Sequence, residues 1–260
     1  MQGIIILGGK GTRLNLFSRR VSNKANAIVY KNLVFEYPIH TLVSAGITDI
    51  TMVVGYRYAG DLLNVIGDGK EFGISNLNYV YQKEASGISD AIYRAKNLIQ
   101  DKCAVILGDN FFEMNIRHHV EDFKKRDKGC ALFCKEVHDP ERYGVAEVGS
   151  LQETLGLRKR QVFSIIEKPD QPKHNTAVTG LYFYDETLFD KIDKLKPSDR
   201  GELEVTDLNM LYAKEASAVA YDVEGYWNDM GTFDSILDTA TFIRNSNFQV
   251  GHQVNAWDIK

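Results

Sequence analysis

The chain has 260 residues, which is enough for one large domain with a sizeable hydrophobic core. Its composition, 44% hydrophobic and 25% charged, is typical of globular proteins, and no apolar run approaches the roughly 20 residues of a membrane span. A formal net charge of −4 argues against a nucleic-acid or membrane-surface partner, because both call for basic patches. Since the chain enters a strand-like run at once and shows no signal-peptide pattern, we expect a cytoplasmic protein.

Strand and helix patterns alternate over the first 110 residues. Apolar, strand-like runs occur at Ile4–Leu7, Asp49–Val54, Leu77–Tyr81 and Ala104–Leu107. Helical patterns lie between them at Val34–Ala45, Tyr58–Ile66 and Ile88–Ile99. This alternation predicts a mostly parallel sheet that is covered by helices on both faces.

The second half of the chain is richer in strand patterns. After a predicted helix at Ile116–Lys125, strands are predicted at Ala131–Val137, Val145–Val148, Val162–Ile166 and Val178–Tyr184. Helices near Glu186–Leu195 and Glu204–Lys214, a strand at Ala218–Asp222 and a helix from about Phe233 complete the series. We predict one α/β domain over residues 1–260, with a single Rossmann-like, mostly parallel mixed sheet and a small β-rich part. Its expected divisions are 1–110, 111–232 and a helical tail, 233–260.

The glycine-rich run from Gly8 to Leu14 directly follows the first apolar strand. Glycines let backbone N–H groups approach a polyphosphate, and Arg13 adds a forked, permanently charged donor. The dinucleotide fingerprint requires a glycine where Leu14 stands, and the Walker loop requires Ser or Thr where Gly11 follows Lys10. An ordinary tight turn is the alternative interpretation, but the position after the first strand favours an anion-binding loop.

Two aspartates follow or precede predicted elements. Asp109 comes directly after an apolar strand, and ligand sites in open α/β sheets lie at the carboxyl ends of strands. Asp229 lies ahead of the last predicted helix. Each is also compatible with a structural role, for Asp109 a helix N-cap. Together with the glycine-rich loop they favour a Mg²⁺–triphosphate site, because Mg²⁺ takes hard oxygen ligands and bridges phosphates.

Charged residues at loop positions are further candidates. Pro169 ends the strand before it and holds Lys168 at a fixed exit point, where Glu167 can accept hydrogen bonds from hydroxyl groups. A plain surface ion pair between Glu167 and Lys168 is the alternative. Lys24, in the loop after Arg13, is a further cation for a phosphate ligand.

Taken in order, these segments resemble the nucleoside-diphosphate-sugar pyrophosphorylase family, and most closely its members that use dTTP and glucose 1-phosphate. The matching segments are Gly8–Leu14, Glu36–Pro38, Ala45–Ile47, Gly67–Gly69, Phe72–Ile74, Leu107–Asn110, Asp139–Val145, Glu167–Pro169, Val178–Tyr184, Arg200–Asp207, Trp227 and Asp229–Thr232. The resemblance covers nearly the whole chain. It implies a GT-A-like nucleotidyltransferase fold with a nucleotide-binding first half and a second half that binds the sugar phosphate.

The resemblance also implies a reaction. A sugar 1-phosphate, foremost glucose 1-phosphate, attacks the α-phosphorus of dTTP in line, and a dTDP-sugar and pyrophosphate form with Mg²⁺ as cofactor. Three alternatives stay open: UTP as the nucleotide, an amino or deoxy sugar 1-phosphate, or an inactive relative that binds a nucleotide sugar and regulates a partner. We expect a homo-oligomer, either a dimer or a tetramer.

The resemblance assigns roles to individual residues. Asp109 and Asp229 would hold Mg²⁺, and Arg13, Lys24 and Lys168 would be the catalytic cations. The implied nucleotide contacts are Leu7, Gly8, Gly9, Gly11, Thr12, Arg13, Gln82, Gly87 and Asp109, with Gln82 and Gly87 at the pyrimidine edge. The implied sugar-phosphate contacts are Tyr143, Gly144, Glu167, Lys168, Val178, Arg200 and Trp227. The chain departs from the usual family residues at Leu7, Ile28 and Asp90, where alanine, proline and glutamine are common.

Overall fold

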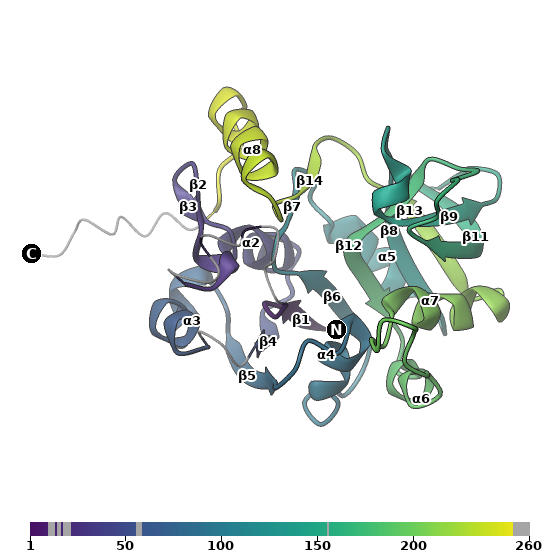
Figure 1. Ribbon diagram of the computed structural model, residues 1–260, viewed down its shortest axis with the longest axis horizontal. Helices are drawn as coiled ribbons and strands as arrows, with labels where there is room; N and C mark the ends of the chain where they lie inside the picture. The colour runs from purple at the N-terminus through teal and green to yellow at the C-terminus, as the bar shows by residue number, and fades with distance from the viewer. Residues whose placement is uncertain (10–13, 15–16, 18–21, 56–58, 155, 252–260) are drawn as a thin grey trace, which may run out of the picture.

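The computed structural model describes residues 1–9, 14, 17, 22–55, 59–154 and 156–251 (Figure 1). Its centre is a ten-stranded mixed sheet. The strands are β1 (Gln2–Ile6), β4 (Asp49–Gly55), β5 (Asn76–Gln82), β6 (Cys103–Leu107), β8 (Cys130–Glu136), β9 (Gly144–Val148), β10 (Gln152–Thr154), β11 (Leu157–Glu167), β12 (Thr176–Tyr184) and β13 (Ala218–Asp222). Their order is β10-β11-β13-β8-β12-β6-β1-β4-β5, and β9 pairs with both β11 and β12.

The first half of the sheet is parallel, as its alternating pattern predicts. Strands β6, β1, β4 and β5 pair in parallel, with Ile4 opposite both Thr51 and Val105. Successive side chains of β1 enter different cores, because they point to opposite faces of the sheet. Ile5 packs in the core under one set of helices, and Ile4 and Ile6 pack in the other core. Such burial on both faces explains the continuous apolar run.

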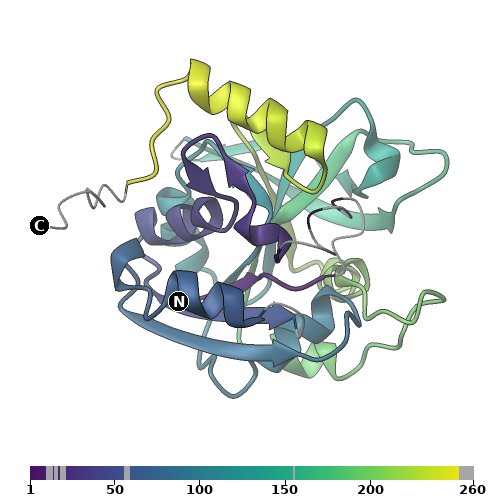
Figure 2. The same ribbon diagram turned by 60° about the vertical axis from the view of Figure 1, so that its left-hand side comes forward.

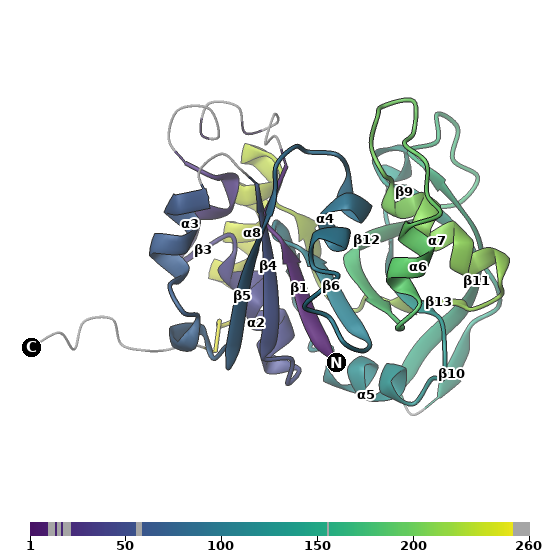
Figure 3. The ribbon, with the colours of Figure 1, turned by 90° about the horizontal axis from the view of Figure 1, so that it is seen from below.

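Helices cover both faces of the sheet. One core takes side chains from α2 (Glu36–Ser44), α3 (Ala59–Ile66) and α5 (Arg117–Lys124). The other takes side chains from α4 (Ile88–Arg94), α6 (Leu188–Ile192) and α7 (Val205–Lys214). Figure 3 shows α2 and α4 on opposite sides of the parallel strands. No helix among the described residues is both long and apolar enough to cross a membrane.

The second half of the sheet is joined to the first through β12. This long strand pairs antiparallel with β6 along Leu181–Tyr184 and antiparallel with β8 on its other side. Strand β13 then adds in parallel to β8, and β11 adds antiparallel to β13. The sheet is therefore mixed, parallel in the first half of the chain and largely antiparallel in the second half.

Short elements complete the fold. They are β2 (Ile28–Val29), β3 (Asn32–Leu33), β7 (Asn110–Phe112), β14 (Trp227–Asp229), α8 (Phe233–Asn245) and the single turns η2 (Lys24–Asn26), η3 (Lys70–Phe72) and η4 (Pro140–Arg142). Strand β7 pairs with β14, and β2 pairs with β3. Figure 2 shows α8, in yellow, lying over the purple β2–β3 hairpin, and Val29 and Ile243 share a small third core there.

Three elements have an end that differs by three residues or more from its predicted position. The helix predicted at Ile88–Ile99 ends at Arg94, because the chain continues in tighter turns such as Leu98 N to Ala95 O, 2.9 Å. The helix predicted at Glu186–Leu195 shortens to α6 because Asp185 accepts hydrogen bonds from Thr187 in a turn before it. Strand β11 extends back to Leu157, beyond the predicted start at Val162.

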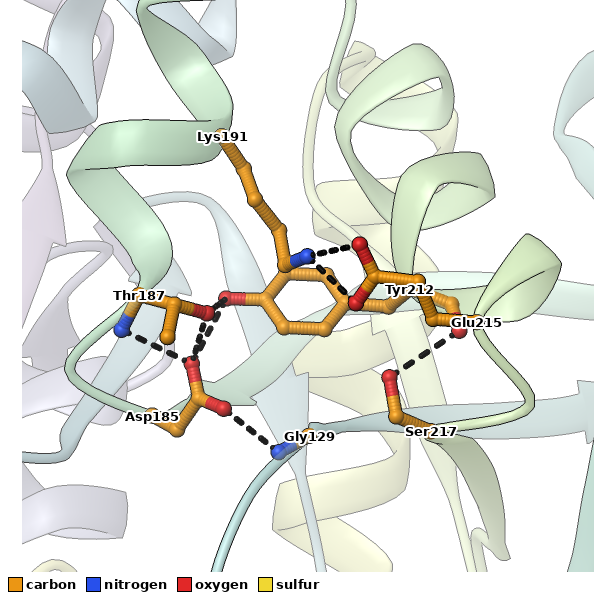
Figure 4. A network of polar contacts seen from close by, with 7 residues as sticks. All are labelled: Gly129, Asp185, Thr187, Lys191, Tyr212, Glu215 and Ser217. Carbon is orange, nitrogen blue, oxygen red and sulfur yellow. Dashed lines mark hydrogen bonds and ion pairs between the residues drawn. The ribbon is translucent and has the colours of Figure 1, made fainter.

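A buried polar network holds α6 and α7 together at the far end of the sheet (Figure 4). Asp185 is 2% exposed, and its Oδ1 accepts hydrogen bonds from the Thr187 hydroxyl at 2.6 Å and the Tyr212 hydroxyl at 3.0 Å. Lys191 lies over the Tyr212 ring and contacts both carboxylate oxygens of Glu215 at 2.6 Å. Burial and nearby acidic groups raise the pKa of Tyr212 well above its usual value, so the hydroxyl remains a donor.

Candidate active site

A cavity of about 440 Å³ lies between the two halves of the molecule. It opens at the carboxyl ends of β1, β5 and β6, where ligands bind in open α/β sheets, and is bounded opposite by β9, β12 and α7. The predicted site residues that line it are Gly8, Gly9, Lys24, Gln82, Gly87, Asp109, Tyr143, Gly144, Glu167, Lys168, Val178, Arg200, Trp227 and Asp229. Gly11, Thr12 and Arg13 lie outside the described residues.

Leu7 is the predicted site residue that the structure does not bring to the cavity. Its side chain is 1% exposed and packs in the core with Ile5. Its backbone N donates to Val53 O at 2.8 Å, and its carbonyl accepts from Asn23 Nδ2 at 3.2 Å. Leu7 therefore supports the glycine-rich loop from beneath, while the loop backbone at Gly8 and Gly9 faces the cavity.

Lys24 reaches the cavity from the short turn η2. Asn23 caps this turn, since its Oδ1 accepts from Ala25 N at 2.9 Å while its amide group holds Leu7 O. The Lys24 ammonium then forms an ion pair and hydrogen bond with Asp109 Oδ2. The loop thus delivers Lys24 to the carboxylate at the end of β6, without the proline that the family commonly has at position 28.

The two predicted metal-binding aspartates come together through β7 and β14. In this antiparallel pair Asp229 lies opposite Asn110, and Met230 N donates to Asp109 O at 2.7 Å. Asp109 lies in a turn between two strands, not at a helix N-cap. Gly108 before it leaves no space for a side chain, because a Cβ there would lie 2.8 Å from the backbone oxygen of Ile6.

The carboxylates of Asp109 and Asp229 fit a Mg²⁺ ion. Both line the cavity, and among the described residues no group of three or more acidic, histidine or cysteine side chains forms a closed metal cage. Mg²⁺ suits such an open set, because it is commonly held by one or two carboxylates while water and substrate phosphates supply its other oxygen ligands.

Asn110 is a site residue that the sequence analysis did not select. Its Oδ1 accepts hydrogen bonds from Trp227 Nε1 at 2.8 Å and from Gly180 N at 3.1 Å, and its Nδ2 lies 3.3 Å from Asp109 Oδ1. It is buried and ties β12, β14 and Asp109 together. The only sequence signal is its place directly after Asp109, since its partners are far away in the chain.

The opposite end of the cavity is rich in charged groups. Glu167 Oε1 lies 3.5 Å from Lys168 Nζ and 3.8 Å from Arg200 Nη2, and Glu167 Oε2 accepts from the Thr206 hydroxyl at 2.6 Å. The Glu167–Lys168 ion pair therefore exists, but it faces the cavity. Lys168 has a positive φ of 43°, and its N–H donates to Tyr143 O at 3.0 Å. These backbone contacts fix the point, just after the end of β11, from which the Lys168 side chain extends.

Aromatic groups line this same end. The rings of Tyr143 and Trp227 lie 5.4 Å apart between centroids, and the Arg142 guanidinium lies 5.4 Å from the Tyr143 ring. A hydrogen bond to Asp139 raises the pKa of Arg142, so this cavity-lining group stays charged. Flat rings beside charged donors suit a phosphorylated sugar, whose ring offers C–H faces and whose phosphate is anionic.

Uncharged groups line part of the cavity at the ends of the parallel strands. Gln82 ends β5 and Gly87 precedes α4, and both line the space with Gly8 and Gly9. Gly87 has a φ of 104°, and a Cβ there would lie 2.4 Å from Leu203 O, so only glycine fits.

The fold and this cavity define a class, an α/β protein with a ligand-sized cavity, lined in part by cationic side chains, at the carboxyl ends of its parallel strands. The model of the nucleotidyl transferase family matches residues 2–246, and the chain belongs to this family.

Named relatives are similar over nearly the whole chain. A glucose-1-phosphate thymidylyltransferase of Neisseria meningitidis is 36% identical over 248 residues, which cover 94% of this chain and 83% of the relative. One of Mycolicibacterium smegmatis is 37% identical over 260 residues, covering 98% of this chain and 86% of the relative.

Solved structures agree with the fold. A Bacillus anthracis protein assigned as a glucose-1-phosphate thymidylyltransferase, in complex with sucrose, superposes with a TM-score of 0.86 at 37% identity, covering 96% of this chain and 97% of that one. A UDP-glucose pyrophosphorylase with bound UDP-glucose gives a TM-score of 0.80 at 20% identity, covering 94% and 98%. The expected α/β nucleotidyltransferase fold is therefore confirmed.

Proposed function

We propose that this protein joins dTTP and glucose 1-phosphate to form dTDP-glucose and pyrophosphate, with Mg²⁺ as cofactor. The observation that carries the proposal is one cavity with two unlike ends. Gly8, Gly9 and Asp109 line it at the carboxyl ends of the parallel strands, and Lys168 and Arg200 line it from the second half of the chain. The relatives named as thymidylyltransferases support dTTP and glucose 1-phosphate as the substrate pair.

In this proposal the triphosphate lies across Gly8, Gly9, Gly11 and Thr12, whose glycines allow close backbone approach. Arg13 and Lys24 neutralise the departing pyrophosphate, and the base lies against Gln82 and Gly87. Residues 1–110 form the nucleotide half, and 111–232 form the sugar-phosphate half. Residues 233–260 are the C-terminal tail, which begins with α8.

The sugar phosphate occupies the charged end. Lys168 and Arg200 bind its phosphate, because both are half-exposed cations that line the cavity beside Glu167. Glu167 and the backbone at Gly144 and Val178 hold the sugar hydroxyls, with the Tyr143 and Trp227 rings beside them.

The proposed chemistry is a single displacement. A phosphate oxygen of the sugar phosphate forms a bond to the α-phosphorus of dTTP, and the bond from that phosphorus to the pyrophosphate oxygen breaks. Such transfers depend mainly on positioning and on charge stabilisation. When bound by Asp109 and Asp229, Mg²⁺ supplies positive charge at the α-phosphate. Lys24, Arg13 and Lys168 hold the two anionic reactants in line.

A substrate matrix tests the proposal. Purified protein is mixed with dTTP, UTP, dCTP, ATP or GTP, paired with glucose, amino-sugar or deoxy-sugar 1-phosphates, and pyrophosphate release is measured with Mg²⁺ and with EDTA. We expect the highest kcat/KM for dTTP with glucose 1-phosphate. With EDTA we expect no release of pyrophosphate. A higher value for UTP or for another sugar would revise the substrates. No pyrophosphate from any pair would overturn the enzymatic assignment and favour a regulatory binding protein.

We also expect a homo-oligomer in the cytoplasm. Light scattering of the purified protein measures the number of subunits, and fractionation of the source cells measures the location.

A further inference from the structure

The side-chain amide of Gln82 is held in one orientation. Gln82 is 5% exposed at the end of β5, and its Nε2 donates to Gly87 O at 3.0 Å and to Asp90 Oδ2 at 2.9 Å. A backbone carbonyl and a carboxylate can only accept hydrogen bonds. Both hydrogens of the Gln82 amide group are therefore committed away from the cavity, whichever nucleotide arrives.

The carbonyl oxygen of Gln82 is left facing the ligand space. A Cβ built on Gly8 would lie 3.1 Å from Gln82 Oε1, which places this oxygen beside the glycine that lines the cavity. Within the described part of the chain, no hydrogen bond to Oε1 is formed. A nucleotide base in this end of the cavity therefore meets an acceptor and not a donor.

Asp90 is itself held firmly. It lies in the first turn of α4, where a carboxylate is favoured by the helix dipole, and it is 7% exposed. Arg94, one turn later, forms an ion pair with Asp90 Oδ1 and lies 3.4 Å from Oδ2 through Nε. The charge of Asp90 is thus compensated from the solvent side, while its Oδ2 remains bound to Gln82.

We infer that Asp90 is a positioning residue that sets base selectivity by fixing the amide of Gln82. The inference rests on the proposed function, which places the base at Gln82. A fixed acceptor matches the ring N3–H of thymine or uracil. It opposes the lone pair at N3 of cytosine, because two acceptors then face each other without a hydrogen. A site built for one hydrogen-bond pattern rejects the other strongly.

The test changes only the hydrogen-bonding character of residue 90. In Asp90→Asn one of the two fixed acceptors becomes an amide that can donate to Gln82 Oε1, so Gly87 O alone still favours the original orientation of the Gln82 amide. The turned orientation, which presents the Gln82 NH₂ group to cytosine N3, therefore becomes more populated. We expect the ratio of dissociation constants for dCTP and dTTP, measured by calorimetry without sugar phosphate, to fall at least about tenfold, which is the loss of one well-placed hydrogen bond. Asp190→Asn, the same change in the exposed first turn of α6, should leave the ratio unchanged.

A double-mutant cycle separates positioning from a general structural effect. If Asp90 acts through Gln82, then Asp90→Asn should have no effect on the nucleotide ratio in a Gln82→Ala background. An unchanged ratio in Asp90→Asn, or an equal change in both backgrounds, would overturn the inference. Equal binding of dCTP and dTTP by the wild type would do the same.

The binding assay keeps the two proposals apart. A wild type that discriminates between dTTP and dCTP but releases no pyrophosphate would contradict the proposed reaction and leave the role of Asp90 standing. Should Asp90→Asn not fold, a crystal structure of the wild type with dTTP decides. We expect thymine N3 to lie within about 3.2 Å of Gln82 Oε1, with Gln82 Nε2 still bound to Asp90. A base bound elsewhere would refute the role of Asp90.

Discussion

Lys24 and Asp109 meet in the lining of the cavity although 85 positions separate them in the chain. The side chains are 19% and 9% exposed, so the pair is largely shielded from water and its attraction is stronger than at a surface. In our proposal a bound triphosphate offers Lys24 a second anionic partner, and Mg²⁺ offers Asp109 a second cation. In the free protein the charges of Lys24 and Asp109 thus compensate each other. In the proposed complex, the triphosphate and Mg²⁺ would supply the opposite charges at the same place.

The aspartate pair gives the sharpest prediction at this scale. Asp109→Asn and Asp229→Asn each remove a charge but keep the side-chain size, so each should lower kcat at least about 100-fold, the scale of losing one charge-stabilising group. Steady-state pyrophosphate release measures kcat, and circular dichroism checks that the variants are folded. Asp68→Asn, in an exposed ion pair away from the cavity, is the matched control. Near-normal turnover in either folded variant would show that its aspartate is not a metal ligand.

Among the elements, those with a local pattern could be predicted from the sequence. Strands β1, β4 and β6 are short apolar runs because both faces of the sheet are covered, and β13 is predicted with both of its bounds, Ala218 and Asp222. Charged residues make the start of β11 hard to recognise in the sequence. Arg158 and Arg160 interrupt its apolar pattern, yet both lie beside Asp222 of β13 in the folded protein.

Elements that depend on distant partners could not be predicted. Strands β7 and β14 are three residues each, and each exists only because the other lies beside it. For the same reason the roles of Asn110 and Asp90 are invisible in the sequence, since their hydrogen bonds cross between elements. Most predicted site residues do line the cavity, but their grouping came from the family resemblance and not from spacing.

Helix α5 buries a histidine against the sheet. His119 is 8% exposed and lies 5.3 Å from Phe133 and 4.9 Å from Tyr221 between ring centroids. Burial lowers its pKa from 6.5 to about 4, with a small opposing effect of Asp122 and a further lowering by His118. The neutral form is therefore the one that packs in the folded protein.

This burial predicts a pH dependence of stability. The unfolded state takes up the proton first, so stability is complete above pH 6.5 and is lost as the pH falls toward 4, by about 3 kcal/mol in total. His119→Phe should remove most of that loss, measured as the free energy of unfolding in urea at several pH values. His118→Phe, at an exposed position on the same helix, should keep it. A slope that is the same in His119→Phe and the wild type would contradict this account.

At the scale of the whole molecule, the two halves are joined on both sides of the cavity. Beneath the cavity, β12 joins the two halves of the main sheet, because it pairs with β6 on one side and with β8 on the other. At its rim, Leu203 N donates to Ser86 O at 2.8 Å, and Ser89 N donates to Leu203 O at 3.1 Å. The loop beside the proposed base site is therefore hydrogen-bonded to the segment that precedes α7 in the second half of the chain. This arrangement favours a cavity of fixed shape that holds two substrates at once.

An isotope-tracing experiment tests the central claim, that this cavity directs a sugar-phosphate oxygen to the α-phosphorus of dTTP. The three non-bridging phosphate oxygens of glucose 1-phosphate are labelled with heavy oxygen. The labelled sugar phosphate is incubated with dTTP, Mg²⁺ and enzyme, and the masses of the products are measured by mass spectrometry. Because the bond that breaks lies within dTTP, all three labels should appear in dTDP-glucose and none in pyrophosphate. Labelled inorganic phosphate or pyrophosphate, or unlabelled dTMP as the main product, would contradict the account.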